Sequence, residues 1–306
     1  MASMTMKKRI LMPILLGYAF VSNFSHAEVS QNNHEKLAKK VSHPAYGSRS
    51  PRIRSHIGLI FDEQSQSPIY AKNSREVAPI ASITKLMTAM VLRDAKLPMD
   101  KEITIEVADR DKLKWSRSRL KVGMTFTRNE LLKLALMASE NMAASALART
   151  YPGGKLGLIA AMNAKANELG MENSKFVDPA GLSQENVSTA QDLVKMVSAA
   201  LKYPLIQQYT TTTSLSVDGL KGREMRFGNT NPLVRSASWD IGVSKTGYIS
   251  EAGLCLVMEA NINDRSVIIV LLNSWGKYTR TADANRIRKW MESPYMRNRV
   301  VRHGES

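Results

Sequence analysis

The sequence predicts an α+β fold in which strands from both ends of the chain form one sheet around an inserted helical subdomain. Two short apolar runs near residues 56–62 and 67–72 flank a polar turn and indicate a β-hairpin. Three apolar runs in the last third, at residues 239–248, 252–262 and 265–274, also indicate strands. The segment between these two groups has helical periodicity, so we expect it to be inserted into the sheet domain.

The helices of the middle segment are predicted from apolar stripes and capping residues. The first runs from about Ser82 to Asp94, with an apolar stripe that faces the core. Residues 101–126 have the pattern of short strands and turns. Thr127 and Glu130 have capping-box spacing and start the next helix. Further helices are expected at residues 141–151, 155–170, 189–204 and 281–292.

The first 27 residues have the layout of a secretory signal peptide. A basic start and an apolar run precede small residues that end at Ala27, where we expect cleavage. The apolar run is shorter than the roughly 20 residues of a transmembrane helix. We therefore expect an exported, periplasmic protein without an integral membrane span. The other expected boundaries are a flexible polar arm at residues 28–54, a folded domain at 55–292 with its helical subdomain at about 95–225, and a polar tail at 293–306.

Charge and cysteine content limit the partners. The net charge is +16, and loss of the three basic residues of the signal peptide lowers it to +13. This surplus favours anionic partners such as a membrane surface or an acidic polymer, and nucleic acid is not expected for an exported protein. Cys255 is the only cysteine, so no intramolecular disulfide can form, and its apolar neighbours in the sequence indicate a core residue.

Several catalytic classes are excluded by missing residues. Of the five histidines only His56 borders the predicted fold, whereas a Ser-His-Asp triad needs an imidazole fixed beside the serine. The chain has no G-x-S-x-G elbow, no H-E-x-x-H pair, no Cys/His cluster and no Walker phosphate loop, so neither a metal nor a cofactor is expected. An enzyme with this sequence would use a lysine or a carboxylate as its base.

Ser82 and Lys85, in the segment ASITKLMTAM, place a hydroxyl and an amine one helical turn apart. Ser82 would stand at the helix N-terminus, where free N–H groups and the helix dipole favour an oxyanion. Desolvation and positive partial charge lower the pKa of a lysine there, so the neutral amine becomes available as a base. A lone S-x-x-K, however, is more often a helix cap beside a lysine that reaches solvent.

Two further motifs make the catalytic interpretation stronger than the helix-cap interpretation. Ser139 and Asn141 form S-x-N at the junction of two predicted helices. Lys245, Thr246 and Gly247 form K-T-G on a predicted strand in the last third. Each fragment is common alone, but the ordered set of S-x-x-K, S-x-N and K-T-G on a suitable scaffold is not.

In these three motifs the chain resembles the penicillin-recognising serine D,D-peptidase and serine β-lactamase superfamily. It is most similar there to low-molecular-mass penicillin-binding proteins of the D-alanyl-D-alanine endopeptidase type. The segments PIASITKLMTAMV, LLKLALMASEN, FVDPAGLS and GKYTRTADANRIRKWM share this likeness, which covers about residues 56–291. The resemblance implies an α/β (α+β) fold with an antiparallel five-stranded sheet flanked by helices, an inserted all-helical subdomain and an active site between them.

The resemblance also implies a catalytic role for three side chains. Ser82 would be the acylated nucleophile, and Lys85 would be the base that takes its proton. Ser139 would pass a proton to the leaving amine. The oxyanion hole would consist of the backbone N–H groups of Ser82 and Tyr248, although a tyrosine is larger than the residue often found at that position.

The remaining motif residues would bind substrate by the same resemblance. Asn141 would position the substrate backbone, while Lys245 and Thr246 would hold a substrate carboxylate. Gly247 has no side chain and would let the substrate lie against the strand, with Tyr248 next to it. The implied partners are peptidoglycan peptides, with β-lactam antibiotics as covalent inhibitors.

The expected function is therefore a periplasmic serine D,D-peptidase that hydrolyses D-alanyl bonds in peptidoglycan cross-links. A D-alanyl-D-alanine carboxypeptidase would share the site, but the short polar segment after Trp290 favours the endopeptidase type. A class A β-lactamase would need a deacylating glutamate, and Glu168 and Glu172 lack the spacing of that family. A non-catalytic murein-binding module on the same fold is the remaining alternative.

One motif is left open by the sequence. The segment KLKWSRSRLK, residues 112–121, is strongly basic. It would suit an acidic murein strand, and it would equally suit a solvated surface hairpin with no partner.

Overall fold

A computed structural model describes residues 50–219 and 223–296. The expected signal peptide at 1–27, most of the arm at 28–54 and most of the tail at 293–306 lie outside the described residues. The last residues of the arm pack onto the domain, since Ile53 is buried and the Arg54 N–H donates to Asp283 Oδ1 at 2.9 Å. Within the described ranges, no helix is both long and apolar enough to cross a membrane.

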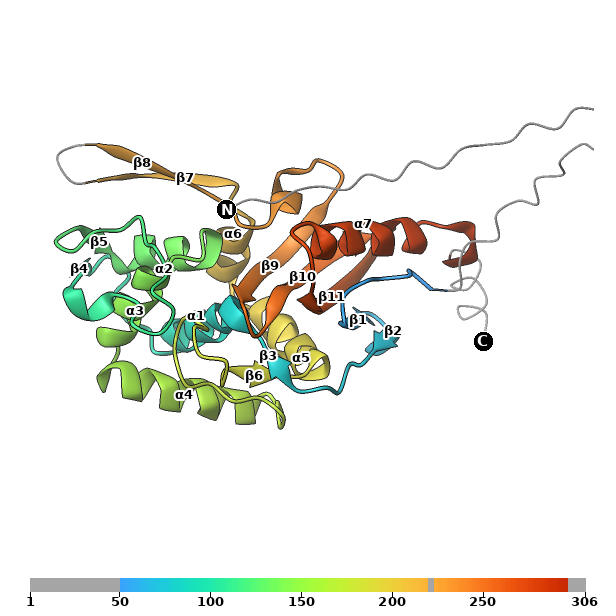
Figure 1. The fold of residues 1–306 in the computed structure, drawn as a ribbon, viewed down its shortest axis with the longest axis horizontal. Coiled ribbons are helices and arrows are strands. Elements are labelled where there is room, and N and C mark those ends of the chain that lie inside the picture. The colour runs from blue at the N-terminus through green and yellow to red at the C-terminus, as the bar shows by residue number, and fades with distance from the viewer. Residues whose placement is uncertain (1–49, 220–222, 297–306) are drawn as a thin grey trace, which may run out of the picture. The chain divides into compact units, whose positions relative to one another are not determined.

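Five antiparallel strands form the central sheet, in the order β2-β1-β11-β10-β9 (Figure 1). Strands from the two ends of the chain meet where β1 pairs with β11, and this confirms the expected sheet. Asn263 and Asp264 have positive φ of 52° and 59° and form the two-residue turn between β10 and β11, as the mirror-image hairpin turns require. The strand bounds are β1 Ile57–Asp62, β2 Ser67–Lys72, β9 Asp240–Ile249, β10 Gly253–Ile262 and β11 Arg265–Ser274.

Helices cover both faces of the sheet (Figure 1). Helix α7 (Thr279–Met291) packs on one face, whereas α5 (Ala190–Ala200) packs on the other face and contacts α1 (Thr84–Asp94). Neighbouring residues of a strand point to opposite faces, so Val257 belongs to the larger core and Met258 to the core under α7. This burial on both sides explains why β10 and β11 are apolar almost throughout.

The insert between β2 and β9 carries most of the remaining helices. The expected capping box is present, because Thr127 Oγ1 accepts from the Glu130 N–H and Glu130 Oε2 accepts from the Thr127 N–H. One helix was not predicted: α6 begins at Pro204, where a missing N–H costs nothing in the first turn. The further bounds are η1 Ala81–Ile83, α2 Arg128–Met137, α3 Asn141–Arg149, α4 Gly154–Glu168 and α6 Pro204–Thr211.

The insert also contains short strands, so it is mainly but not purely helical. The pair β7–β8 extends away from α6 in Figure 1 and was not predicted. Only Val217 and Phe227 of this pair are buried, so the apolar alternation that identifies a strand is weak. The bounds are β3 Ala78–Pro79, η2 Val107–Asp109, β4 Glu102–Thr104, β5 Thr125–Thr127, β6 Val187–Ser188, β7 Ser214–Asp218, β8 Glu224–Gly228 and η4 Pro232–Arg235.

Candidate active site

The serine of the first motif stands where η1 runs into α1. Ser82 is half-buried in η1, and its Oγ donates to Ala180 O at 3.2 Å. Ala81, directly before it, has a φ of 48°, so the chain turns sharply ahead of the serine. The structure therefore places the hydroxyl at the start of α1, as the sequence indicated, in a 3-10 turn that leads into the helix.

Lys85 is the centre of the first hydrogen-bond network. It is only 1% exposed, which excludes the interpretation of a lysine that reaches solvent. Its Nζ donates to three oxygens, each at 2.8 Å: Ser82 Oγ, Asn141 Oδ1 and Ala180 O. The S-x-x-K and S-x-N motifs thus meet at one amine.

The protonation of this amine is governed by burial. Burial lowers the pKa of Lys85 to about 7, because the ammonium form loses its hydration. The negative charges of Asp178, Glu140 and Asp111 act in the opposite direction and limit the fall. Both the neutral and the charged amine are therefore populated near neutral pH.

A tight loop in the segment FVDPAGLS holds the carbonyl that Lys85 contacts. Asp178 Oδ1 accepts from the backbone N–H groups of Ala180 and Gly181, each at 2.7 Å, and its other oxygen accepts a further loop N–H at 2.8 Å. Gly181 has a φ of 78°, and a Cβ there would lie 1.8 Å from Ala81 O, so a side chain does not fit. The buried carboxylate thus fixes the position of Ala180 O.

Lys245 is the centre of a second network on β9. It is also 1% exposed, and its Nζ donates to Ser139 Oγ and to Thr246 O, each at 2.9 Å. Burial lowers the pKa of Lys245 well below its usual value, and the positive charges of Lys85 and Arg280 lower it further. Ser139 stands at the α2–α3 junction with a φ of 59°, which turns its hydroxyl toward β9.

The rest of the K-T-G segment fixes how β9 meets η1. Thr246 is buried, and its Oγ1 donates to Thr230 Oγ1 at 2.6 Å. A Cβ on Gly247 would lie 3.0 Å from Ser82 N, so this glycine leaves room for the backbone of η1. The Tyr248 side chain is 63% exposed and lies outside both networks.

The structure adds contacts that the sequence motifs did not identify. Asn141 Nδ2 donates to Ser116 Oγ at 2.9 Å, so the basic stretch 112–121 touches the site directly. The Asp178 carboxylate and the Ala180 carbonyl were also missed, although Asp, Pro and Gly in that segment are typical of a loop built around an aspartate. The Ser116 contact had no sequence signal, because it depends on how two distant loops pack.

Two residues that could support a different catalytic mechanism, a cysteine nucleophile and a deacylating glutamate, lie outside both networks. Cys255 is fully buried, and burial raises the pKa of its thiol to about 11, so it is the core residue that the sequence indicated. Glu168 ends α4, where it is exposed and pairs with Lys165 at 2.8 Å. Glu168 is not among the hydrogen-bond partners of Ser82 or Lys85 in the described residues, where a deacylating glutamate would be expected. Among the residues that the structure describes, no cluster of His, Cys, Asp or Glu could hold a metal.

Comparison with known proteins decides the family. The family model for D-alanyl-D-alanine carboxypeptidase matches residues 44–276. The chain belongs to this family. It is 46% identical over 242 residues to a D-alanyl-D-alanine endopeptidase of Pseudomonas aeruginosa, covering 79% of this chain and 78% of that protein. It is 45% identical over 244 residues to one of Escherichia coli, covering 79% of each.

Solved structures of the family share the fold. The crystal structure of a Streptomyces DD-transpeptidase superposes with a TM-score of 0.72 at 29% identity, covering 79% of this chain and 98% of that one. Family membership confirms the resemblance that the three motifs indicated. The protein is therefore a peptidase, which is a class of hydrolase.

Proposed function

We propose that the protein is a periplasmic serine D,D-peptidase that hydrolyses D-alanyl bonds in peptidoglycan cross-links through an acyl-enzyme on Ser82. Its family and the two endopeptidase relatives at 45–46% identity support the reaction class. The observation that carries the mechanism is the set of partners around the Lys85 amine.

These partners determine where the lone pair of a neutral amine would face. Ala180 O is a carbonyl and can only accept a hydrogen bond. Asn141 Oδ1 can only accept as well, and its amide is oriented by the bond from Nδ2 to Ser116 Oγ. A neutral Lys85 has two N–H groups for these two oxygens. Its lone pair then faces the one partner that can donate, the Ser82 hydroxyl at 2.8 Å, whose proton would turn from Ala180 O to the amine.

The acylation step follows from this arrangement. Lys85 takes the hydroxyl proton while Ser82 Oγ forms a bond to the carbonyl carbon of the D-alanyl peptide bond. The backbone N–H groups of Ser82 and Tyr248 are the proposed oxyanion donors. The 3.0 Å approach between the Gly247 Cβ position and Ser82 N supports this pairing, because it brings the two backbone segments together.

The second network would serve the two ends of the substrate. As the C–N bond breaks, the leaving amine takes the proton that Lys85 accepted from Ser82, and Ser139 is the proposed relay for this transfer. Lys245 and Thr246 are the proposed ligands of a substrate carboxylate, while Asn141, from the first network, is proposed to position the substrate backbone. Water then hydrolyses the ester on Ser82, which releases the new carboxylate and restores the hydroxyl. A β-lactam would acylate Ser82 in the same way.

Covalent labelling tests the mechanism. Fluorescent penicillin should label the protein, and mass spectrometry should place the adduct on the peptide that contains Ser82. Ser82→Ala should abolish both labelling and hydrolysis while the melting temperature stays close to that of the wild type. An adduct on another residue, or labelling that survives in Ser82→Ala, would refute the assignment. A wild-type protein that takes no label at all would favour the non-catalytic murein-binding module.

The main competing function is a D-alanyl-D-alanine carboxypeptidase, which is the activity that the family description names. Cross-linked muropeptide dimers and monomeric pentapeptides, offered at equal concentration, separate the two activities. An endopeptidase converts dimers to monomers with the larger kcat/KM. Release of D-alanine from pentapeptides with the larger kcat/KM would establish the carboxypeptidase instead.

Export is the last part of the proposal. Cleavage of the first 27 residues should leave a mature chain that begins at Glu28. N-terminal sequencing of the protein from the periplasmic fraction checks this. Retention of residues 1–27 in that fraction would contradict a cleaved signal peptide.

A further inference from the structure

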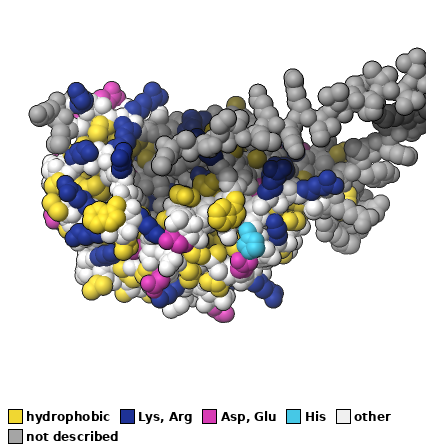
Figure 2. All heavy atoms as spheres, viewed as in Figure 1, with side chains coloured by type: hydrophobic (Ala, Val, Ile, Leu, Met, Phe, Trp, Pro, Cys, Tyr) yellow, Lys and Arg dark blue, Asp and Glu magenta, His cyan; other side chains and the backbone are white. Residues whose placement is uncertain are grey.

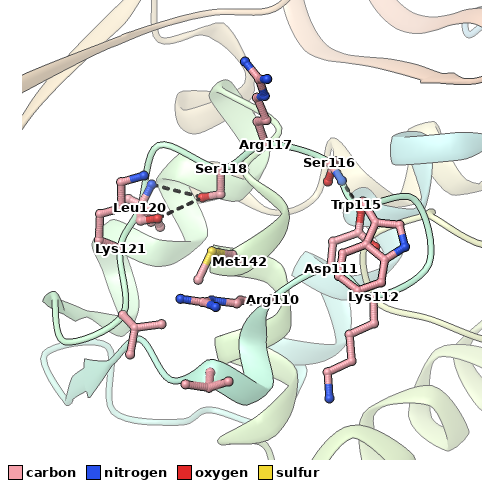
Figure 3. A pocket seen from close by; sticks show the side chains of 12 residues that line it. Arg110, Asp111, Lys112, Trp115, Ser116, Arg117, Ser118, Leu120, Lys121 and Met142 are labelled. Atoms are coloured by element: carbon pink, nitrogen blue, oxygen red, sulfur yellow. Dashed lines mark hydrogen bonds between the residues drawn. The ribbon is translucent and has the colours of Figure 1, made fainter.

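A pocket beside the active site is formed by the loop that contains the basic stretch 112–121. Its volume is about 650 Å³. Apolar side chains form one part of its wall and four cations another; the apolar residues are Val107, Leu120, Val122 and Met142, and the cations are Arg110, Lys112, Arg117 and Lys121. Figure 3 shows Arg110 lying across the middle of the pocket next to Met142, whereas Arg117 and Lys112 point outward from the loop.

The four cations of this pocket are free to meet a ligand. Among the described residues, no carboxylate forms an ion pair with Arg110, Lys112, Arg117 or Lys121, although the same loop pairs Lys114 with Glu251. The one acidic residue of the wall is Asp111. Its oxygens are turned to the loop itself, where they accept the N–H groups of Leu113, Lys114 and Ser116. Figure 2 shows many Lys and Arg side chains on the left of its view, where Figure 1 places α2–α4.

The loop is held in place on both sides. Ser116 lines the pocket and accepts from Asn141, which in turn bonds Lys85, so two hydrogen bonds link the pocket wall to the proposed catalytic amine. Ser118 Oγ donates to Glu140, between the two residues of the S-x-N motif. On the far side, the Arg119 guanidinium lies 4.4 Å from the centre of the Phe227 ring on β8. The wall of the pocket is therefore connected to the proposed catalytic amine through Asn141.

We propose that this pocket binds the second peptide arm of a cross-linked substrate, with Arg110 holding a carboxylate and the apolar wall taking the aliphatic part of the arm. The assignment rests on the proposed function. A cross-link joins two peptide arms, and only one of them can occupy the Lys245 subsite. Arg suits a carboxylate because its planar guanidinium can donate two parallel hydrogen bonds. A monomeric pentapeptide has no second arm, so the pocket would select cross-linked substrates.

Steady-state kinetics of Arg110→Gln on two substrates tests the proposal. The KM for a cross-linked muropeptide dimer should rise about fivefold with kcat unchanged, the size expected when an exposed but well-formed carboxylate contact is lost. The KM for a monomeric pentapeptide and the rate of acylation by benzylpenicillin should stay within twofold of the wild type. Arg110→Lys should recover part of the loss, since the charge remains but the bidentate geometry does not.

Matched controls separate this pocket from a general charge effect. Arg75→Gln and Lys202→Gln remove exposed cations outside the pocket and should leave both KM values unchanged. A dimer whose carboxylates are amidated should bind wild type and Arg110→Gln equally well. An unchanged KM for the dimer in Arg110→Gln, or an equal rise for dimer and pentapeptide, would overturn the proposal.

Failure of the proposed function looks different from failure of this inference. If wild-type protein neither takes up penicillin nor cleaves a dimer, the proposed function is wrong. If wild type cleaves the dimer and Arg110→Gln cleaves it with the same KM, only the pocket assignment is wrong.

Discussion

Lys85 and Lys245 are both buried lysines, yet their surroundings differ in charge. Three carboxylates, those of Asp178, Glu140 and Asp111, oppose the effect of burial on Lys85 and leave its pKa at about 7. Among the described residues, no carboxylate does so for Lys245, whose pKa is lowered first by burial and then by positive neighbours. These surroundings agree with the two roles proposed above: Lys85 can exchange a proton near neutral pH, whereas Lys245 has no counter-charge among the described residues and could receive one from a substrate carboxylate.

The largest expected effect comes from removing the amine of the first network. Lys85→Met should slow acylation of Ser82 by benzylpenicillin about 10³-fold or more, because the hydroxyl loses its general base. Methionine fills a similar volume, so the fold should be retained. Stopped-flow acylation and a thermal melt measure the two properties, with Lys202→Met as the control for loss of a lysine elsewhere. Rapid acylation by Lys85→Met would show that another group takes the proton.

A smaller and more selective effect is expected for the second network. Lys245→Met should raise the KM of a carboxylate-terminated peptide roughly tenfold to a hundredfold, as expected for loss of a charge-assisted hydrogen bond. The same peptide with an amidated terminus should bind wild type and variant alike. If Lys245→Met instead lowers kcat for both peptides and leaves each KM unchanged, Lys245 does not bind the substrate carboxylate, and the proposed difference in role between Lys245 and Lys85 is wrong.

Much of this fold was predictable because its signals are local. The strands β10 and β11 are apolar throughout, and the Thr127–Glu130 capping box depends on neighbours in the sequence. The pair β7–β8 lacks such a signal because it exposes most of its residues. Helix α6 lacks one because Pro204 is compatible both with the end of one helix and with the start of the next.

The candidate site also has a part that the sequence predicted and a part that it did not. The three motifs identified the residues that carry the proposed chemistry, and the structure brings Ser82, Lys85 and Asn141 within hydrogen-bond distance. The supporting contacts could not be predicted, since they join parts of the chain that are far apart. Ser116 reaches Asn141 across the α2 segment, and the Ala180 carbonyl reaches Lys85 from the following loop. The side chains with a proposed chemical role belong to short sequence motifs, whereas the contacts that position them depend on how distant segments pack.

The smallest expected effect concerns the carboxylate behind the first network. Asp178 has two separate influences on Lys85: its charge raises the pKa of the amine, and its bonds to the Ala180 and Gly181 N–H groups hold the carbonyl that the amine contacts. In the wild type the neutral amine falls about tenfold for each pH unit below 7, so the acylation rate should fall on the acid side and level off above pH 7.

Asp178→Asn should change this pH profile in two ways. Loss of the negative charge lowers the pKa of Lys85, so the acid limb should move to lower pH. The asparagine cannot accept all the loop N–H groups, so the plateau rate should fall severalfold to about tenfold as Ala180 O loses its fixed position. Glu185→Gln, which removes an exposed carboxylate of the same loop, serves as the control and should change neither limb nor plateau. If Asp178 had only a structural role, Asp178→Asn would lower the plateau rate and leave the midpoint of the acid limb where it is in the wild type. That result would show that the charge of Asp178 does not set the pKa of Lys85, and the proposed electrostatic difference between Lys85 and Lys245 would lose this support.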